Sequence, residues 1–226
     1  MIRAVVFDLW NTLVHSRGGD PFLHLQDLMT DAQRTHFLTL KRDAMDKVHP
    51  SAIAFLDRWK PCMEMTETQY GAMSRVFQEA AADAACFPEA LDAVARTKHV
   101  ARLALLSNTQ SFDMAFLERL GLTDLIPNRF LSAETGILKP DPKAFEGVQK
   151  RLNLFPGQLA MVGDSWNDDV QGALEAGWTA IWVNREGRPR PDHDPDAELV
   201  EVSSLAQVPE IIENLQAGAR CSTCLG

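Results

Sequence analysis

The sequence predicts an α/β protein in which a parallel sheet is accompanied by a small all-helical insertion. From residue 88 onward, short apolar stretches alternate with stretches of helical periodicity. Apolar strands alternating with helices are typical of a parallel sheet whose two faces are covered by helices. Residues 18–87 instead show apolar residues at helical spacing, with little Val or Ile and no convincing strand. This insertion is therefore expected to form an all-helical domain.

The first expected strand is residues 2–7, an apolar run rich in β-branched residues that stops abruptly at Asp8. The insertion is expected to begin its first helix at Asp20 and Pro21, because proline is favoured at the first helical position. These features predict a core domain of residues 1–16 and 88–216, a helical cap of residues 17–87 and a C-terminal tail of residues 217–226.

The core segment predicts a regular series of helices and strands. We expect helices at residues 88–98, 111–122, 141–154, 167–177 and 204–216. We expect strands at residues 101–107, 129–132, 158–163 and 179–183. Asp141 and Pro142 provide an N-cap and a first helical residue, and Gly121 is a candidate C-cap. Residues 185–195 are rich in proline and charge, which predicts a surface loop.

Composition and charge exclude several classes of protein. The chain has 226 residues, of which 46% are hydrophobic and 23% charged, as in a globular protein. Its 31 acidic and 22 basic residues give a formal charge of -9, which disfavours nucleic acid and anionic membranes as partners. A small anionic substrate is compatible with this charge if a metal and a lysine reverse the sign locally. Oligomeric state is not indicated.

Cysteine usage and hydropathy favour a cytoplasmic protein. The 4 cysteines are too few for a disulfide framework in a chain of this length. Cys221 and Cys224 form a C-x-x-C, which we interpret as part of a mobile tail because a zinc site would need a second pair of ligands. The opening apolar run is cut short by Asp8, unlike a signal peptide, and no stretch approaches the length of a membrane span.

Polar residues cluster just after the predicted strands or in the loops that follow them. Because ligands bind at the carboxyl ends of the strands in open parallel sheets, these clusters are expected to meet there. A turn, a helix cap or a solvated charge would explain any one of them alone, whereas their joint order indicates a site. The clusters are Asp8 with Thr12, Ser107 with Asn108, Lys139, and the run Gly163-Asp164-Ser165-Trp166-Asn167-Asp168-Asp169.

These residue types suit attack on a phosphate group. A carboxylate such as Asp8 can attack phosphorus and hold it as an acyl phosphate. Two carboxylates repel a phosphate dianion, so Asp8 and Asp164 are expected to bind a Mg²⁺ that screens them. The equatorial phosphate oxygens can accept hydrogen bonds, and Lys139 adds a neutralising positive charge. The donors expected for those bonds are Thr12, Ser107 and Asn108.

Four segments together resemble the motifs of the haloacid dehalogenase-like (HAD) hydrolase superfamily: FDLWNTLV, LLSNT, ILKPDPKAF and VGDSWNDDVQGALEAG. The resemblance spans nearly the whole chain outside residues 18–87, which lie where this superfamily carries a helical cap. It implies a Rossmann-like core, a mobile cap and, in most members, phosphatase activity on a phosphorylated metabolite.

The resemblance also implies a role for each matching residue. Asp8 is expected to be the nucleophile, and Ser107 and Lys139 to hold the phosphate. The implied magnesium ligands are Asp8, the Trp10 backbone carbonyl and Asp164. Asp169 matches a second acidic position that acts through water or orients the others, and Asp168 is the weaker match to it.

The sequence departs from the phosphatase pattern at Trp10. Phosphatases of the superfamily usually carry an aspartate two residues after the nucleophile, as general acid and then base. Loss of such a proton donor costs roughly 10²–10⁴-fold in rate and hampers expulsion of a poor leaving group. His15, at the hinge into the cap, is a hypothetical replacement, although a hinge histidine without chemistry is the simpler interpretation.

Three functions stay open on the sequence alone. The first is a Mg²⁺-dependent phosphatase, favoured by the complete GDSWNDD run. The second is a metal-independent 2-haloacid dehalogenase, since such relatives carry an aromatic residue at the Trp10 position. The third is a phosphometabolite-binding protein that has lost turnover. Some cap residues could meet a second anionic group or line an apolar pocket, although solvated helix faces and helical core are the commoner explanations. They are Arg17, Arg34, Arg42, Arg58, Phe55 and Trp59.

Overall fold

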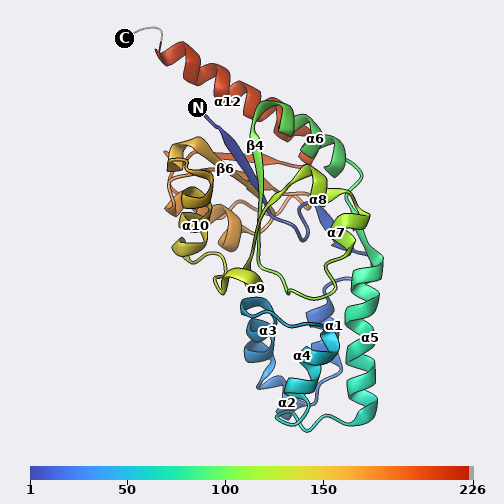
Figure 1. Cartoon of the computed structure of the whole chain (residues 1–226). Helices are drawn as coiled ribbons and strands as arrows, with labels where there is room; N and C mark the ends of the chain where they lie inside the picture. Colours follow the sequence, from blue (N-terminus) through green and yellow to red (C-terminus); the bar gives the residue numbers. More distant parts are fainter. Residues whose placement is uncertain (224–226) are drawn as a thin grey trace.

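A sheet of six parallel strands forms the centre of the larger lobe in Figure 1, in the order β5-β4-β1-β6-β7-β8. The structure is a computed structural model that describes residues 1–223, with side chains described as far as residue 218. The strands are β1 Ala4–Phe7, β4 Arg102–Ser107, β5 Asn128–Leu131, β6 Leu159–Gly163, β7 Thr179–Val183 and β8 Leu199–Val202. The predicted α/β class with a parallel sheet is confirmed.

Helices cover both faces of this sheet. Successive residues of a strand point to opposite sides, so the apolar side chains of the strands need cover on each face. In β1, Val5 and Phe7 join one apolar cluster, whereas Ala4 and Val6 join the other. The helices are α6 Ala90–Val100, α7 Phe116–Arg119, α8 Leu122–Leu125, α9 Ser132–Thr135, α10 Pro142–Leu152, α11 Gly172–Glu175 and α12 Val208–Thr223. Short turns of other helix types are η1 Pro156–Gln158, η2 Trp166–Gln171 and η3 Leu205–Gln207.

Helices α1 to α5 form a second, smaller lobe below the sheet in Figure 1, which we call the cap. They are α1 Pro21–Asp27, α2 Asp31–Arg34, α3 Phe37–Asp46, α4 Ala52–Trp59 and α5 Glu67–Asp83. The predicted start of α1 is confirmed, since the Asp20 carboxylate accepts a hydrogen bond from the Phe22 amide at 2.8 Å and Pro21 is the first helical residue. Phe55 packs inside an apolar core of the cap itself.

The expectation that residues 18–87 lack a strand is wrong at its end. β3 Ala84–Cys86 pairs antiparallel with β2 Val14–Ser16, where the chain leaves and re-enters the core. β3 reads Ala-Ala-Cys and lacks the β-branched and aromatic residues from which a strand could be predicted. This pair of strands joins the two lobes, and the domain boundaries drawn from the sequence stay a prediction.

The helix expected at residues 111–122 is also largely wrong. Only the two short helices α7 and α8 form there, with Gly121 between them at a φ of 74°. The Ser111 hydroxyl instead bonds the backbone of His49, accepting from its amide at 2.8 Å and donating to its carbonyl at 3.0 Å. Phe112 is buried in the cap core. These contacts with the cap hold the start of the segment as a loop.

β8 was not predicted from the sequence. It lies at the edge of the sheet, where three of its four residues keep some exposure to solvent. Glu201 interrupts its apolar run, so the pattern of a buried strand is missing.

The last helix continues into the segment expected to be a tail, because α12 extends to Thr223. Cys224 and the side chain of Cys221 lie outside the described residues, so the interpretation of the C-x-x-C is untested. Within residues 1–223, no helix combines the length and the apolar character that crossing a membrane requires.

Candidate active site at the carboxyl edge of the sheet

Residues far apart in the sequence meet at a cavity of about 850 Å³ between the sheet and the cap. Asp8 follows β1, Asn108 follows β4 and Asp164 follows β6. Since these parallel strands are neighbours, their carboxyl ends bring the three side chains to one edge. Lys139, from the loop between α9 and α10, and Asp169, from η2, line the same cavity.

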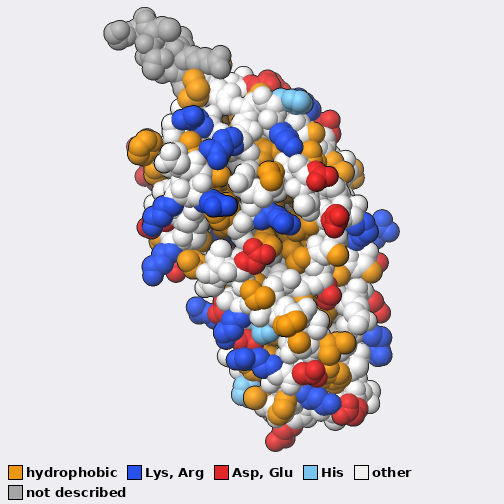
Figure 2. All heavy atoms as spheres, viewed as in Figure 1, with side chains coloured by type: hydrophobic (Ala, Val, Ile, Leu, Met, Phe, Trp, Pro, Cys, Tyr) orange, Lys and Arg blue, Asp and Glu red, His pale blue; other side chains and the backbone are white. Residues whose placement is uncertain are grey.

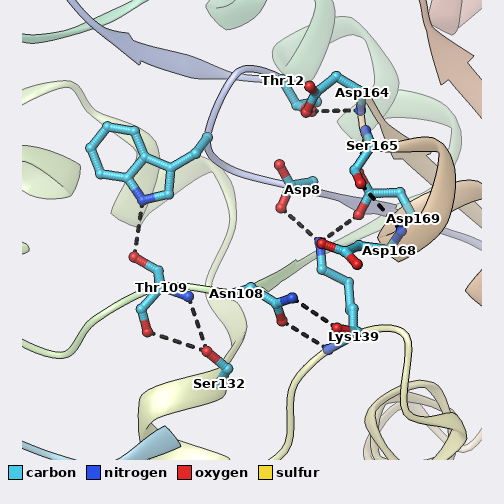
Figure 3. A network of polar contacts seen from close by, with 11 residues as sticks. Asp8, Thr12, Asn108, Thr109, Ser132, Lys139, Asp164, Ser165, Asp168 and Asp169 are labelled. Carbon is cyan, nitrogen blue, oxygen red and sulfur yellow. Dashed lines mark hydrogen bonds and ion pairs between the residues drawn. The ribbon is translucent and has the colours of Figure 1, made fainter. Parts of the chain in front are cut away.

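The Lys139 ammonium lies between two carboxylates, as Figure 3 shows. Its Nζ is 2.7 Å from Asp8 Oδ1 and 2.5 Å from Asp169 Oδ1, and all three side chains are buried. Burial by itself lowers the pKa of Lys139, but the charges of Asp169 and Asp8 outweigh it and raise that pKa above its ordinary value. The lysine therefore stays charged next to the carboxylate of Asp8.

Asp164 is held by Thr12 on the neighbouring loop. The Thr12 hydroxyl accepts a hydrogen bond from the Asp164 amide at 3.1 Å and donates one to Asp164 Oδ1 at 3.3 Å. Burial, followed by the negative charge of Asp8, raises the pKa of Asp164 to about 6. The Asp164 carboxylate is thus positioned in a place where its own negative charge is unfavourable.

Asp169 is fixed by its surroundings from two sides. Its Oδ2 accepts a hydrogen bond from the Ser165 amide at 3.0 Å, while Oδ1 faces Lys139. A Cβ atom at Gly163 would lie 2.2 Å from Asp169 Oδ2, so only glycine at the end of β6 leaves room for this carboxylate. Burial raises the pKa of Asp169 above its ordinary range, against the lowering effect of Lys139.

The three carboxylates form a group that could bind a metal ion. Oxygen atoms of Asp8, Asp164 and Asp169 all lie within 4.8 Å of one another. Hard divalent cations such as Mg²⁺ prefer oxygen ligands of this kind. Burial, with the negative charge of Asp8, raises the pKa of Asp164 and Asp169, and the three carboxylates share one ammonium, so a bound cation would stabilise their charged forms.

Asn108 fixes the backbone of Lys139. Its side-chain amide donates to the Lys139 carbonyl at 2.9 Å and accepts from the Lys139 amide at 2.8 Å, as the paired dashed lines in Figure 3 show. Both ends of the amide are engaged, although Asn108 still lines the cavity. We therefore assign Asn108 the role of positioning the lysine, beside the phosphate contact expected from the sequence.

Ser107 and Thr12 are placed behind the cavity lining. Thr12 is fully buried and its hydroxyl is engaged with Asp164, so it supports that carboxylate. Ser107 is 1% exposed, and among the described residues its hydroxyl has no hydrogen-bond partner. An unpaired buried hydroxyl next to Asn108 fits an acceptor brought by a ligand, because such groups are costly when left unpaired.

Trp10 fills the position expected for a proton donor. Its indole Nε1 donates to Thr109 Oγ1 at 2.9 Å, and its ring packs against Phe116 with centroids 5.2 Å apart. Thr109 is in turn bonded through its backbone to the Ser132 hydroxyl, as Figure 3 shows. Trp10 lines the cavity in this fixed orientation.

His15 does not reach the site. It lies in β2, with its ring against Phe87 at a centroid distance of 4.8 Å, and it is not among the described residues that line the cavity. Its position does not support the hypothesis that it replaces the missing proton donor. Asp168, the weaker acidic match, lines the cavity, and burial raises its pKa.

Two arginines near the site were missed by the sequence reasoning. Arg188 lines the cavity and donates to the Asp164 carbonyl at 2.9 Å. Arg185 donates to the carbonyls of Asn11 and Thr12, at 2.8 and 2.9 Å, and so fixes the loop after Asp8. Both belong to the segment 185–195, which was expected to be a surface loop. Basic residues directly after the strand β7 were the signal in the sequence that could have placed them near the site.

The parallel sheet, the helical cap and the acidic cluster beside a buried lysine agree with the architecture expected for a hydrolase. Residues 2–177 match the family of haloacid dehalogenase-like hydrolases, and the chain belongs to that family. The match confirms the resemblance seen in the four motifs. The chain is therefore a hydrolase.

Relatives with assigned activities include phosphatases. The chain is 37% identical over 118 residues to a phosphoserine phosphatase of Thermus thermophilus. The matched region covers 52% of this chain and 47% of that enzyme. It is 25% identical over 243 residues to the N-acylneuraminate-9-phosphatase of Mus musculus, covering 95% of each.

A solved structure with the same fold is the 2-haloacid dehalogenase of Pseudomonas syringae. It has a TM-score of 0.68 and 22% identity, and covers 95% of this chain and 99% of its own. This likeness concerns the fold.

Proposed function

We propose that the protein is a Mg²⁺-dependent phosphohydrolase that acts on a small phosphorylated metabolite through an aspartyl-phosphate on Asp8. The observation that carries the proposal is the meeting of Asp8, Asp164 and Asp169 around one point, beside the ammonium of Lys139. The phosphatases among its relatives support the same reaction class. A small metabolite substrate fits the cytoplasmic location expected from the sequence.

The residues present fit a magnesium ion. Asp8 and Asp164 would hold it together with the backbone carbonyl of Trp10, and Asp169 would act as a ligand through water. The donors are all oxygens, and the carboxylates of Asp8, Asp164 and Asp169 gather around one point, as a hard divalent cation requires. The ion would supply the positive charge that lets a carboxylate approach a phosphate dianion.

In the first step, a carboxylate oxygen of Asp8 attacks phosphorus while the bond from phosphorus to the leaving group breaks. Lys139 and the Ser107 hydroxyl would stabilise the charge on the equatorial oxygens. Lys139 also holds Asp8 in place, because its ammonium is 2.7 Å from Asp8 Oδ1. In the second step, water attacks the aspartyl-phosphate and releases phosphate with Asp8 regenerated.

Trp10 limits the leaving groups that this site can expel. Its indole has no proton to give to an oxygen in the cavity, because its N–H is used by Thr109. A poor alkoxide leaving group needs such a proton in the transition state. Substrates whose leaving group is stable without protonation are therefore expected to react fastest.

Hydrolysis of p-nitrophenyl phosphate tests the proposal, because its leaving group needs little protonation. We expect turnover in Mg²⁺, loss of turnover in excess EDTA and recovery when Mg²⁺ is restored. Asp8→Asn should abolish turnover in Mg²⁺. Turnover that is unchanged in EDTA, or unchanged in Asp8→Asn, would refute the proposal, as would binding of phosphate without hydrolysis of any ester.

A second candidate is 2-haloacid dehalogenase activity, which the aromatic side chain of Trp10 favours. There, Asp8 would attack carbon, displace halide and form an ester that water hydrolyses. The intact acidic cluster favours the phosphatase, because a dehalogenase needs no metal ligands. Release of halide from 2-chloropropionate in EDTA would establish the dehalogenase instead.

A further inference from the structure

One face of α3 forms the cap side of the catalytic cavity. Leu38, Lys41, Arg42 and Met45 all line it, at the helical spacing i, i+3, i+4 and i+7. Figure 1 shows α3 at the end of the cap that lies nearest the core. Two cations therefore face the site from the cap, between two apolar side chains.

Only one of the arginines considered from the sequence reaches the cavity. Arg42 lines it, whereas Arg17, Arg34 and Arg58 are not among the described residues that do. Lys41 joins Arg42 there, although the sequence gave no reason to select it.

These two cations are not used by the chemistry at Asp8. Lys139 is engaged by Asp8 and Asp169, and Arg188 holds the Asp164 carbonyl. The ion pairs that Lys41 and Arg42 form are longer than those of Lys139. Lys41 Nζ is 3.7 Å from Asp20 Oδ2, and Arg42 Nε is 3.4 Å from Asp46 Oδ2.

Both side chains are accessible to a ligand. The Lys41 and Arg42 side chains are 34% and 76% exposed. Exposed ion pairs of this kind contribute at most about 1 kcal/mol, so an incoming anion can replace them.

The position of Lys41 brings its charge close to the acidic edge of the site. Lys41 lines the same cavity as Asp164, Asp168 and Asp169. The cavity of about 850 Å³ is also large enough for more than a phosphate group, since pockets of roughly 300–1,000 Å³ enclose drug-sized ligands.

We propose that Lys41 and Arg42 are specificity-determining residues that bind a second anionic group, a carboxylate or a phosphate, on the phosphorylated substrate. The inference rests on the proposed function for the first phosphate. With that phosphate at Asp8, the rest of the substrate extends toward α3. Its second anion meets the two cations, and its uncharged part contacts Leu38 and Met45.

Matched pairs of ligands test this directly, through inhibition constants against p-nitrophenyl phosphate in Mg²⁺. O-phosphoserine and O-phosphoethanolamine differ by one carboxylate, and fructose 1,6-bisphosphate and fructose 6-phosphate differ by one phosphate. We expect the member with the second anion to bind at least about tenfold tighter in one pair or both, as for a charge-assisted hydrogen bond. The pair that shows the preference identifies the chemical group.

Cap variants show whether α3 provides that preference. In the double variant Lys41→Gln/Arg42→Gln, the ratio within the responding pair should fall to about one. Arg75→Gln removes a cation from an exposed position of α5 that does not line the cavity, and it should keep the wild-type ratio. Ratios of one in both wild-type pairs, or a ratio kept in the double variant, would overturn the inference.

Failure of the proposed function can be told apart from failure of this inference. If p-nitrophenyl phosphate is not hydrolysed, titration calorimetry of the same four compounds in Mg²⁺ reads the ratios without turnover. A preference for the second anion that is lost in the double variant would then support the α3 site and refute the phosphatase. Circular dichroism of each variant checks that the cap is folded.

Discussion

At the scale of single residues, the site depends on negative charges that are crowded together and only partly neutralised. Lys139 contacts Asp8 and Asp169, while Asp164 has a hydroxyl as its hydrogen-bond partner. The cluster is therefore expected to be less stable without a divalent cation than with one.

The raised pKa of Asp164 gives a pH dependence whose sign can be worked out. Its pKa rises from 3.8 to about 6 in the folded protein, so between these values the folded state holds more protons than the unfolded state. Stability is then lost as pH rises through this window. In EDTA, Asp164→Asn should therefore raise the free energy of unfolding at pH 7 and have less effect at pH 4, as urea denaturation would measure.

Magnesium provides the control for that measurement. In saturating Mg²⁺ the advantage of Asp164→Asn at pH 7 should disappear or reverse, because the ion stabilises the wild-type carboxylate. A variant that is equally less stable than wild type in EDTA at both pH values would contradict the electrostatic account.

Trp10→Asp should restore the missing proton donor. We expect kcat/KM toward simple alkyl phosphates to increase by at least about tenfold, part of the roughly 10²–10⁴-fold that general acids contribute. Trp10→Asn loses the same indole contacts with Thr109 and Phe116 but cannot donate the acidic proton. Equal rates in the two variants would show that the missing acid is not what limits the enzyme.

The residues of the site were largely predictable, whereas their mutual contacts were not. The order of Asp8, Asn108, Lys139 and Asp164 along an alternating pattern was sufficient to expect them at one edge. The bonds from Asn108 to the Lys139 backbone depend on how two distant loops meet, and a one-dimensional pattern carries no information on that.

At the scale of elements, the turn from β6 into η2 has little spare room. Gly163 ends the strand, and Asp169 folds back against it. Strands with continuous apolar runs were predictable because they are fully buried, as in β1 and β6. Elements at the rim, such as β3 and β8, were missed because their residues face solvent in part.

Gly163→Ala should displace Asp169. The added methyl would approach Asp169 Oδ2 to 2.2 Å, so the carboxylate must move away from Lys139. Overpacking of this kind costs about 1–3 kcal/mol, and we expect turnover of p-nitrophenyl phosphate to fall at least about tenfold. Gly157→Ala is a matched control, because a Cβ at that position meets nothing within 4 Å. Full activity in Gly163→Ala would mean that the position of Asp169 is unimportant.

At the scale of the whole molecule, a residue of the core chain segment packs into the hydrophobic core of the cap. Phe112 follows β4 in the core but packs in the cap, stacked on Phe55 with centroids 5.6 Å apart and edge-on to Phe77 at 5.1 Å. The neighbouring Ser111 bonds the backbone of His49. The helical periodicity of residues 111–122 misled the prediction because these side chains pack between lobes.

Phe112→Ala should destabilise the protein by about 3–5 kcal/mol, since it removes a large ring from a packed core. The loss is expected to loosen the cap and raise KM for p-nitrophenyl phosphate. Thermal unfolding measures the first effect and steady-state kinetics the second. Phe155→Ala is the control, because that ring is 78% exposed and its removal should change stability by no more than about 0.5 kcal/mol. A Phe112→Ala protein as stable as this control would contradict this account of Phe112.

The net negative charge of the whole chain does not indicate where an anionic substrate binds. On the face seen in Figure 2, basic and acidic side chains are interspersed over both lobes. The formal charge of -9 therefore does not mark the site, where local cations and a bound metal would set the sign for an anionic substrate.

The most direct test of the account is a crystal structure of the protein grown with Mg²⁺ and beryllium fluoride, a mimic of a bound phosphoryl group. We predict beryllium bonded to a carboxylate oxygen of Asp8, with Mg²⁺ contacting Asp8 and Asp164 and the fluorides facing Lys139 and Ser107. A structure in which Asp8 stays unmodified and no cation lies between Asp8 and Asp164 would contradict it.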